Sequence, residues 1–342
     1  MTDDAALARP VESAPGVRRL RLPLPEAPHE VNAWLLEDGP GWMVVDTGLA
    51  IPSLQGLWEE VFAHGLEGRP VTRVLVTHFH ADHVGLAGWI CGRWKVPLLM
   101  PRSEWLRTRL LAAEDGNIIM QDFAALHQHA GCPPGLLEHM RRRGLSYLNR
   151  VVAPPRSVEA IADGQMLRVG GREWQVLVGA GHTPEMACLW NAADRVLIAA
   201  DHILPRISPH VGIGPAEPDS NPLGIYLGSL AQFRRLPAGT LVLPSHGEPF
   251  HGLHPRIDAL LRHHDQRLDF LRADALAAGA AGRTAYEAIP AMFSRPIRPE
   301  QLGPAAAETL AHLMCLVHRQ ELRIARTDGL IRFFAGGASP AG

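Results

Sequence analysis

The stretch His78-Phe79-His80-Ala81-Asp82-His83 decides which fold and which chemistry this chain is expected to have. It places three imidazoles and one carboxylate within six residues, directly after Val71–Val76, whose β-branched residues predict a buried strand. Buried polar groups need partners, and a divalent cation supplies them. In extended backbone the first two histidines point to the same side, so they can share one metal ion. The aspartate and the third histidine begin the next turn and can reach a second ion. Imidazole with carboxylate suits zinc, manganese or iron.

Three more candidate ligands follow predicted strands elsewhere in the chain. His182 lies in Gly181-His182-Thr183-Pro184, after the strand expected over Glu173–Val178. Asp201 follows the apolar run Val196–Ala200, and His246 follows Leu241–Pro244. A ligand at the end of a strand is held rigidly while its loop stays open to substrate. We therefore expect these three side chains to complete the coordination of two metal ions.

Together with Asp46 in Val45-Asp46-Thr47-Gly48, these residues form five motifs whose order resembles the metallo-β-lactamase superfamily over about Val17 to Gly252. The resemblance implies one divalent ion, zinc before manganese or iron, on His78, His80 and His182, and a second ion on Asp82, His83 and His246. It also implies that Asp201 bridges both ions, with a water or hydroxide between them, and that Asp46 supports the site without being a ligand. The expected catalytic residues are Asp201, as the bridge, and Asp82, as a candidate for proton transfer.

The order of predicted elements indicates a mixed α/β layered domain. Two hairpin strands around Asp38-Gly39-Pro40-Gly41 precede the motif strand, and strands resume after a helical stretch over residues 101–150. The resemblance implies an αββα sandwich over residues 17–252, and the helical pattern of 101–150 predicts an insertion over one edge of the sheet. Residues 253–336 read as three helices followed by a hairpin with an Asp-Gly turn, which is the order of a winged-helix domain. Thr284 and Glu287 form a capping box before the second of these helices. Residues 1–16 are predicted to be a disordered N-terminus.

Composition restricts the partners that we expect. Of the 342 residues, 46% are hydrophobic and 20% charged, which is typical of a globular protein. The net charge of -2 disfavours nucleic acid as a partner, although it leaves room for a local basic patch. No apolar stretch has the length of a membrane span, and the start of the chain lacks the pattern of a signal peptide. The four scattered cysteines indicate free thiols. We therefore expect a cytoplasmic protein, with a homo-oligomer possible.

The resemblance implies hydrolysis of an ester, thioester, lactone or phosphodiester, and a small ester or thioester is the substrate we expect. Glyoxalase-II-like thioesterases (hydroxyacylglutathione hydrolases) share the full ligand set, whereas the C-terminal region resembles the winged-helix extension of the lactamase-beta-2-like branch. Some members of that branch cleave single-stranded RNA, so an RNA or phosphodiester hydrolase is the main alternative, beside a lactonase. Hydrolysis of β-lactams is disfavoured because Asp201 stands where secreted β-lactamases commonly have cysteine.

Two further classes are weaker alternatives. Persulfide dioxygenases share the fold but use one iron ion on a subset of these ligands, and a DNA-binding regulator could use the winged helix. Flavodiiron proteins usually place glutamate where His80 stands, which disfavours them here. The run Arg141-Arg142-Arg143 is either a phosphate contact or a solvated helix face. Glu185, after the Gly-His-Thr-Pro loop, is either a pocket residue or a solvated carboxylate.

Overall fold

The computed structural model describes residues 9–143 and 147–336. By the density of contacts, the chain divides into two compact units. The first unit holds the described residues of Met1–Glu114, Ser146–Pro209 and Gln232–Arg256, and the second holds those of Asp115–Leu145, His210–Ala231 and Ile257–Gly342. The chain passes from one unit to the other several times, so each unit is assembled from segments that are far apart in sequence.

Two sheets form the first unit. The larger sheet is ordered β1-β2-β3-β4-β5-β6-β7. Neighbouring strands from β1 to β4 are antiparallel, and neighbouring strands from β4 to β7 are parallel. The smaller sheet is ordered β12-β11-β10-β9-β8, with β11 and β12 parallel and the other neighbours antiparallel. In chain order the strands are β1 Val11–Ala14, β2 Val17–Pro23, β3 Glu30–Asp38, β4 Gly41–Val45, β5 Val71–Leu75, β6 Leu98–Pro101, β7 Glu159–Ile161, β8 Met166–Val169, β9 Arg172–Gly179, β10 Met186–Asn191, β11 Val196–Ala200 and β12 Leu241–Pro244.

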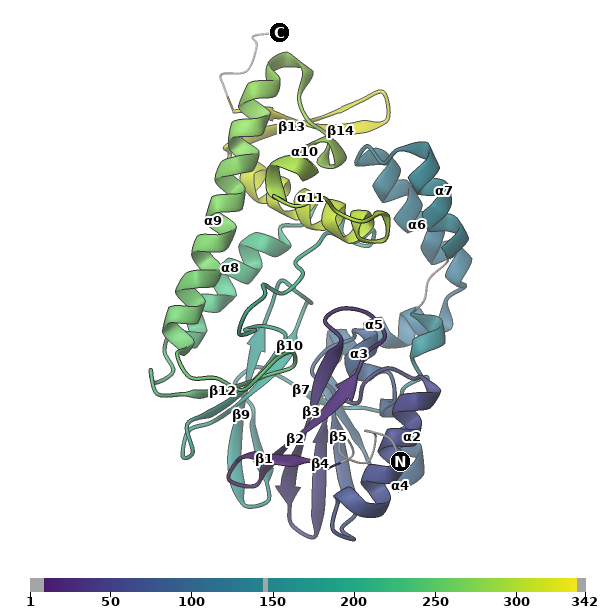
Figure 1. Ribbon diagram of the computed structural model, residues 1–342, viewed down its shortest axis with the longest axis vertical. Coiled ribbons are helices and arrows are strands. Elements are labelled where there is room, and N and C mark those ends of the chain that lie inside the picture. Colours follow the sequence, from purple (N-terminus) through teal and green to yellow (C-terminus); the bar gives the residue numbers. More distant parts are fainter. Residues whose placement is uncertain (1–8, 144–146, 337–342) are drawn as a thin grey trace. The chain divides into compact units, whose positions relative to one another are not determined.

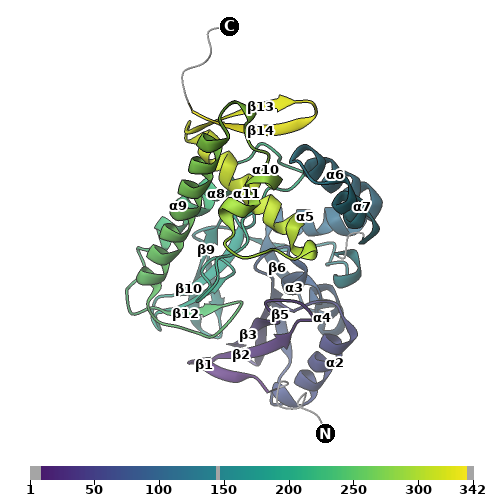
Figure 2. The same ribbon diagram turned by 45° about the horizontal axis from the view of Figure 1, so that its top comes forward.

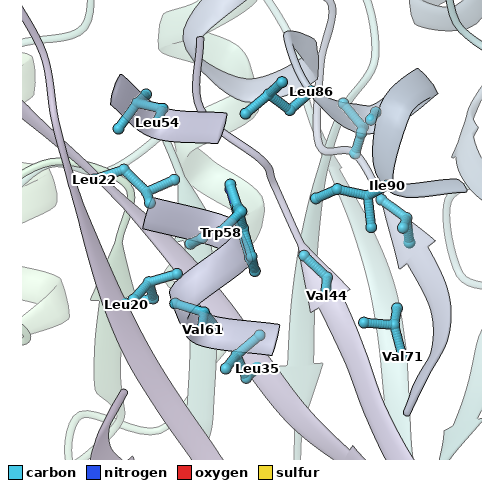
Figure 3. Packing of buried hydrophobic residues seen from close by; sticks show 14 of the residues in the cluster. Leu20, Leu22, Leu35, Val44, Leu54, Trp58, Val61, Val71, Leu86 and Ile90 are labelled. Carbon is cyan, nitrogen blue, oxygen red and sulfur yellow. The ribbon is translucent and has the colours of Figure 1, made fainter. Parts of the chain in front are cut away.

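Alternation along the strands divides the apolar side chains of the first unit into two cores. Trp34 and Leu36 of β3 face the smaller sheet, whereas Leu35 between them faces the helices. Figure 1 shows helices α2 (Pro52–Glu60) and α4 (Ala87–Trp94) on one side of the larger sheet and strands of the smaller sheet on the other. In Figure 3 Trp58 of α2 packs among Leu20, Leu22 and Val61. The predicted mixed α/β layering is thereby confirmed.

Shorter elements of the first unit lie next to the functional loops or at the ends of helices. They are the π-helical turn η1 (Val61–Gly65), the one-turn helix α3 (Ala81–Val84), helix α5 (Arg102–Ala113) and the 3-10 turn η2 (Leu148–Arg150). Helix α8 (Pro222–Phe233), which the sequence reading did not predict, begins in the second unit and ends in the first.

The second unit is mainly helical. Helices α6 (Gly116–His129) and α7 (Pro134–Arg143) pack on each other around Ala124, Cys132 and Leu137. From Ile257 onward, helix α9 belongs to this unit. Figure 2 shows α10 and α11 beside the β13–β14 hairpin. The bounds of these elements are α9 Leu253–Ala278, η3 Gly279–Ala281, α10 Ala285–Met292, η4 Pro299–Gln301, α11 Leu302–His318, β13 Leu322–Thr327 and β14 Leu330–Ala335.

Local signals in the C-terminal region correspond closely to what the sequence predicted. The capping box is confirmed: the Thr284 side chain accepts from the Glu287 backbone, and the Glu287 carboxylate accepts from the Thr284 backbone. Asp328 and Gly329 both have positive φ, as the tight turn between β13 and β14 requires. The order of three helices and a hairpin is also as expected.

One expectation needs correction. Val11–Ala14, placed by the sequence in a disordered N-terminus, forms strand β1 and pairs with β2; Ala14 and Val17 are buried in the core between the sheets. Within the stretch predicted as an insertion, 101–150, helix α5 belongs to the first unit and α6 and α7 belong to the second. The break falls at extended Glu114, after which the Asp115 side chain accepts from Asn117 N–H and starts a new helix.

The structure also bears on membrane insertion and disulfide formation. Among the described residues, no helix has both the length and the apolarity to span a membrane. All four cysteines are free and buried.

Candidate metal centre

The six-residue motif emerges at the end of β5, as the sequence predicted. His78 follows β5 after Val76 and Thr77, and His80 stands at the N-terminal boundary of α3, which carries Asp82 and His83. His182 lies in the loop between β9 and β10, Asp201 directly follows β11, and His246 follows β12. All seven predicted ligands therefore lie in the first unit, five at strand ends or in adjoining loops and two, Asp82 and His83, on the short helix α3.

The first group of converging ligand atoms comprises His78, His80, His182 and Asp201, whose ligand atoms lie within 4.8 Å of one another. The Nε2 of His78 is 3.0 Å from Nδ1 of His80. The Oδ2 of Asp201 is 3.5 Å from Nε2 of His182 and 3.8 Å from Nε2 of His78. Ligands about 2.0–2.1 Å from a tetrahedral ion lie roughly 3.4 Å apart, so most of these separations suit one shared cation.

The second group comprises Asp82, His83 and His246. The Oδ2 of Asp82 lies 3.6 Å from Nε2 of His83 and 3.5 Å from Nε2 of His246. Asp201 faces this group as well, with Oδ1 3.5 Å from His246 Nε2 and Oδ2 3.5 Å from His83 Nε2. Asp201 is thus the one carboxylate, among the seven predicted ligands, that approaches imidazoles of both groups.

Burial and charge make this donor set fit a divalent cation. Among the described residues, Nε2 of His83 and Oδ1 of Asp201 are buried without a hydrogen-bond partner. Burial and the neighbouring histidines hold the pKa values of His78 and His80 well below the ordinary value, so both rings are neutral and able to coordinate. Burial alone would raise the pKa of Asp201, but the imidazoles of His246 and His83 outweigh it and hold that pKa well below its ordinary value.

His83 shows the opposite balance. Burial lowers the pKa of His83, but the carboxylates of Asp82, Asp201 and Asp46 together raise it well above the ordinary value. These acidic groups therefore favour positive charge at the ring. A metal ion on Nε2 would supply that charge in place of the proton.

Asp46, predicted as a supporting residue, holds one ligand of each group in place. Its Oδ2 is 2.8 Å from Nδ1 of His83 and also accepts from the Thr77 hydroxyl at 2.8 Å, while Oδ1 accepts from the Thr77 N–H at 2.8 Å. The Thr77 hydroxyl in turn lies 2.9 Å from His78 Nδ1. Because the Nδ1–H of His83 is directed at Asp46, Nε2 is left for a cation. Asp46 itself has φ of +62°, a strained backbone that such a network can maintain.

Strand β3 fixes the loop of His246, which the sequence did not indicate. The Glu30 carbonyl lies 2.6 Å from Nδ1 of His246 and orients the ring. Buried Asn32 donates its side-chain N–H groups to the carbonyls of Pro244 and Gly247, both at 2.8 Å. Nothing distinguishes Asn32 as a site residue in sequence, since it is one polar residue within an apolar strand.

A second unpredicted residue is Glu104 of α5, which is fully buried. Its carboxylate accepts from the backbone N–H groups of Phe79 and Glu185. Phe79 lies between the predicted ligands His78 and His80 in the chain, so this hydrogen bond restrains the backbone that carries both histidines. In sequence Glu104 is one charged residue in a helical pattern.

The two features left open by the sequence, Glu185 and the run of three arginines, have different outcomes. Glu185 is exposed, but its carboxylate is bonded to the Ser103 hydroxyl at 2.5 Å and the Ser103 N–H at 3.2 Å, so it is a loop residue tied to the start of α5. Arg141 is exposed on α7 in the second unit, whereas the side chains of Arg142 and Arg143 lie outside the described set.

Comparisons with known proteins agree with this geometry. Residues 27–246 match the family model of the metallo-beta-lactamase superfamily, and residues 273–336 match that of the metallo-beta-lactamase-like C-terminal domain. The solved structure of a beta-lactamase domain protein from Burkholderia ambifaria is 39% identical, with a TM-score of 0.90, over 96% of this chain and 95% of that one.

Two fungal relatives are more distant. A lactamase-like protein of Emericella nidulans is 26% identical over 77% of this chain and 68% of its own length. An atrochrysone carboxyl ACP thioesterase of the same organism is 22% identical over 66% of this chain and 54% of its own length, so this chain spans about half of that relative.

Proposed function

Because the chain belongs to the metallo-beta-lactamase superfamily and is a metal-dependent hydrolase, we propose that it uses two metal ions to hydrolyse a small ester or thioester. The observation that carries the binuclear part is the position of Asp201, whose two oxygens approach imidazoles of both ligand groups. We propose zinc as the metal, with manganese or iron as alternatives, since the donor set is imidazole and carboxylate. The first ion would be held by His78, His80 and His182, the second by Asp82, His83 and His246, and Asp201 would bridge them.

The chain's own residues would divide the remaining work. When bound, a pair of divalent ions supplies a nucleophilic hydroxide at neutral pH and polarises the carbonyl under attack. Asp201, whose side chain is only 9% exposed, keeps the two groups at a fixed separation. Asp82 is 25% exposed and is the proposed acceptor and donor of the proton, because it is the more accessible carboxylate of the site.

The substrate class rests on three observations. The fungal relative named as a thioesterase acts, by its name, on an acyl group carried as a thioester. The net charge of -2 is a poor match for a polyanion such as RNA. We also propose Phe79 as an apolar contact for an acyl chain, because its ring centroid lies 4.6 Å from that of His80, with the Arg107 guanidinium 4.6 Å from the Phe79 ring centroid.

We further propose roles for the two units. All seven ligands lie in the first unit, which would be the catalytic domain, and the helices and hairpin of the second would form a winged-helix-like domain. Four free cysteines favour a reducing, cytoplasmic location. Sedimentation of the metal-loaded protein would test whether it forms a homo-oligomer.

The test is a turnover screen on protein reconstituted with zinc, manganese or iron. Metal content should approach two ions per chain, and acyl thioesters or esters should be hydrolysed, with activity lost on chelation. Lactones, phosphodiesters and single-stranded RNA are measured at equal metal loading and moderate salt. Efficient cleavage of RNA with no turnover of any carbonyl substrate would refute the substrate proposal. One iron per chain with oxygen consumption on a persulfide would refute the hydrolytic one.

A further inference from the structure

We propose that Glu104 is a positioning residue for the first metal ion: its buried carboxylate fixes the two loops that carry His78, His80 and His182. The proposal rests on the proposed function, since it assumes that these histidines bind a metal. Glu104 was not among the residues expected to act at the site, and it lies on helix α5 rather than on a strand end.

The carboxylate bridges two segments that are remote in sequence. Its Oε2 accepts from the backbone N–H of Phe79 at 3.0 Å, and its Oε1 accepts from the backbone N–H of Glu185 at 2.7 Å. Phe79 is the residue between the first two ligand histidines, and Glu185 follows His182 by three positions. A carboxylate has acceptor sites only, so both oxygens suit backbone donors. One side chain therefore fixes the spacing between the loops that provide the three histidines.

Further contacts restrict both loops. The Tyr147 hydroxyl donates to the Phe79 carbonyl at 2.8 Å, so the peptide groups on both sides of Phe79 are bonded. Glu185 donates its backbone N–H to Glu104, and its own carboxylate accepts from the hydroxyl and the backbone N–H of Ser103 at the start of α5. Helix and loop are thus linked reciprocally. An arrangement with this many contacts is suited to hold ligands in place, because metal sites tolerate little displacement of their donors.

The two ligand groups differ in their direct supports, although Asp46 also reaches His78 of the first group through the Thr77 hydroxyl. Asn32 and Glu30 hold the loop of His246, and Asp46 holds the ring of His83; both of these ligands belong to the second group. Among the contacts described for the carboxylate of Glu104, the backbone donors belong to the loops of the first group. Weakening this carboxylate should therefore affect the first ion more than the second.

The experiment uses the full-length protein loaded with cobalt(II), whose visible spectrum reports coordination, and chelator competition to obtain the affinity of each ion. Glu104→Gln keeps the size of the side chain but places an NH₂ group against one of the two backbone N–H donors. We expect the affinity of one ion to fall by roughly 10- to 100-fold, with a changed cobalt spectrum and the other ion held as in the wild type. With the ester or thioester substrate, kcat should fall while KM stays within a few-fold.

Two control variants separate positioning from general destabilisation. Glu114→Gln makes the same chemical change at an exposed position at the end of the same helix. Leu54→Ala removes a fully buried side chain from the core on α2 and should lower the melting temperature of the same unit. Neither should change the cobalt spectrum or the stepwise affinities.

The outcomes separate this proposal from the proposed function. Wild-type affinities and spectrum in Glu104→Gln would overturn the positioning role. So would an equal loss at both ions that Leu54→Ala reproduces, because the carboxylate would then contribute only to folding. If the wild type bound a single ion, the binuclear function would fail, but Glu104→Gln would still be expected to weaken that ion through the histidines of the first group.

Discussion

Replacing Asp46 by asparagine tests whether Asp46, which is not one of the seven predicted ligands, determines the tautomer of His83. The backbone N–H of Thr77 can only donate, so the oxygen of the new side-chain amide must remain on that side. The NH₂ group then faces Nδ1 of His83, at the position where Asp46 Oδ2 now lies 2.8 Å away. His83 can no longer donate from Nδ1, and its proton moves to Nε2, the atom that would bind the second ion.

The size of the effect follows from the hydrogen bond that is lost. A bond to a charged acceptor contributes about 1.5–3 kcal/mol, and each 1.4 kcal/mol is about tenfold in affinity. The second ion should therefore bind roughly 10- to 100-fold more weakly, the range typical of such supporting partners. Chelator competition with zinc or cobalt measures the two stepwise affinities, and the loss should appear mainly in one of them.

The matched control is Asp38→Asn. Asp38 also accepts charge-assisted hydrogen bonds, from Arg73 at 2.8 and 2.9 Å, but it lies at the far end of β3 and takes no part in the ligand network. This variant should lose stability without losing metal affinity. Unchanged affinities in the Asp46 variant, or an equal loss in the Asp38 variant, would show that the ring of His83 is not governed by its carboxylate partner.

Three further predictions concern other parts of the chain. Asp201→Ala should bind one ion fewer and lose nearly all turnover, because no other of the seven predicted ligands has a carboxylate within 4 Å of imidazoles of both groups; two ions by elemental analysis together with normal kinetics would contradict this. Thr284→Ala should destabilise the second unit by about 1 kcal/mol through loss of its cap, measured as a shift in the urea midpoint, and no shift would contradict the cap's role. Burial lowers the pKa of His264 to about 3 from 6.5, so the unfolded chain takes up the proton first as pH falls below 6.5. Stability should be complete above that pH and decline below it by up to ~1.4 kcal/mol per pH unit for this ring; His264→Phe should reduce the slope in urea titrations, and an unchanged slope would contradict the prediction.

The convergence of the candidate metal ligands could be predicted from sequence because their chemistry conflicts with their surroundings. A run of imidazoles after a β-branched strand has no packing role, and each of the remaining ligands also follows an apolar strand. Strand ends of a layered sheet converge, so the seven side chains meet although they span residues 78–246. The same reasoning gave the mixed α/β layers, since alternating and continuous apolar runs are strong local signals.

What could not be predicted depends on contacts between distant segments. Glu104 finds its partners 25 and 81 residues away, and both are backbone groups, which leave no mark on the side-chain pattern. Asn32 similarly serves carbonyls more than 200 residues away. Strand β1 was missed because only Ala14 of its four residues is buried, so its sequence carries almost no alternation. In each case tertiary pairing, rather than local preference, gives the residue its role.

The supporting residues also explain why a two-ion site would tolerate so little freedom. Each ligand imidazole has two nitrogens, and the atom that stays available is decided by the partner of the other. Asp46 makes this choice for His83, the Glu30 carbonyl makes it for His246, and the Thr77 hydroxyl lies in the corresponding position for His78. Asp201 would then add its two oxygens to a donor set whose imidazole rings are already oriented. The cost of ordering the site is therefore met when the chain folds, and the cations would meet donors that need little further rearrangement.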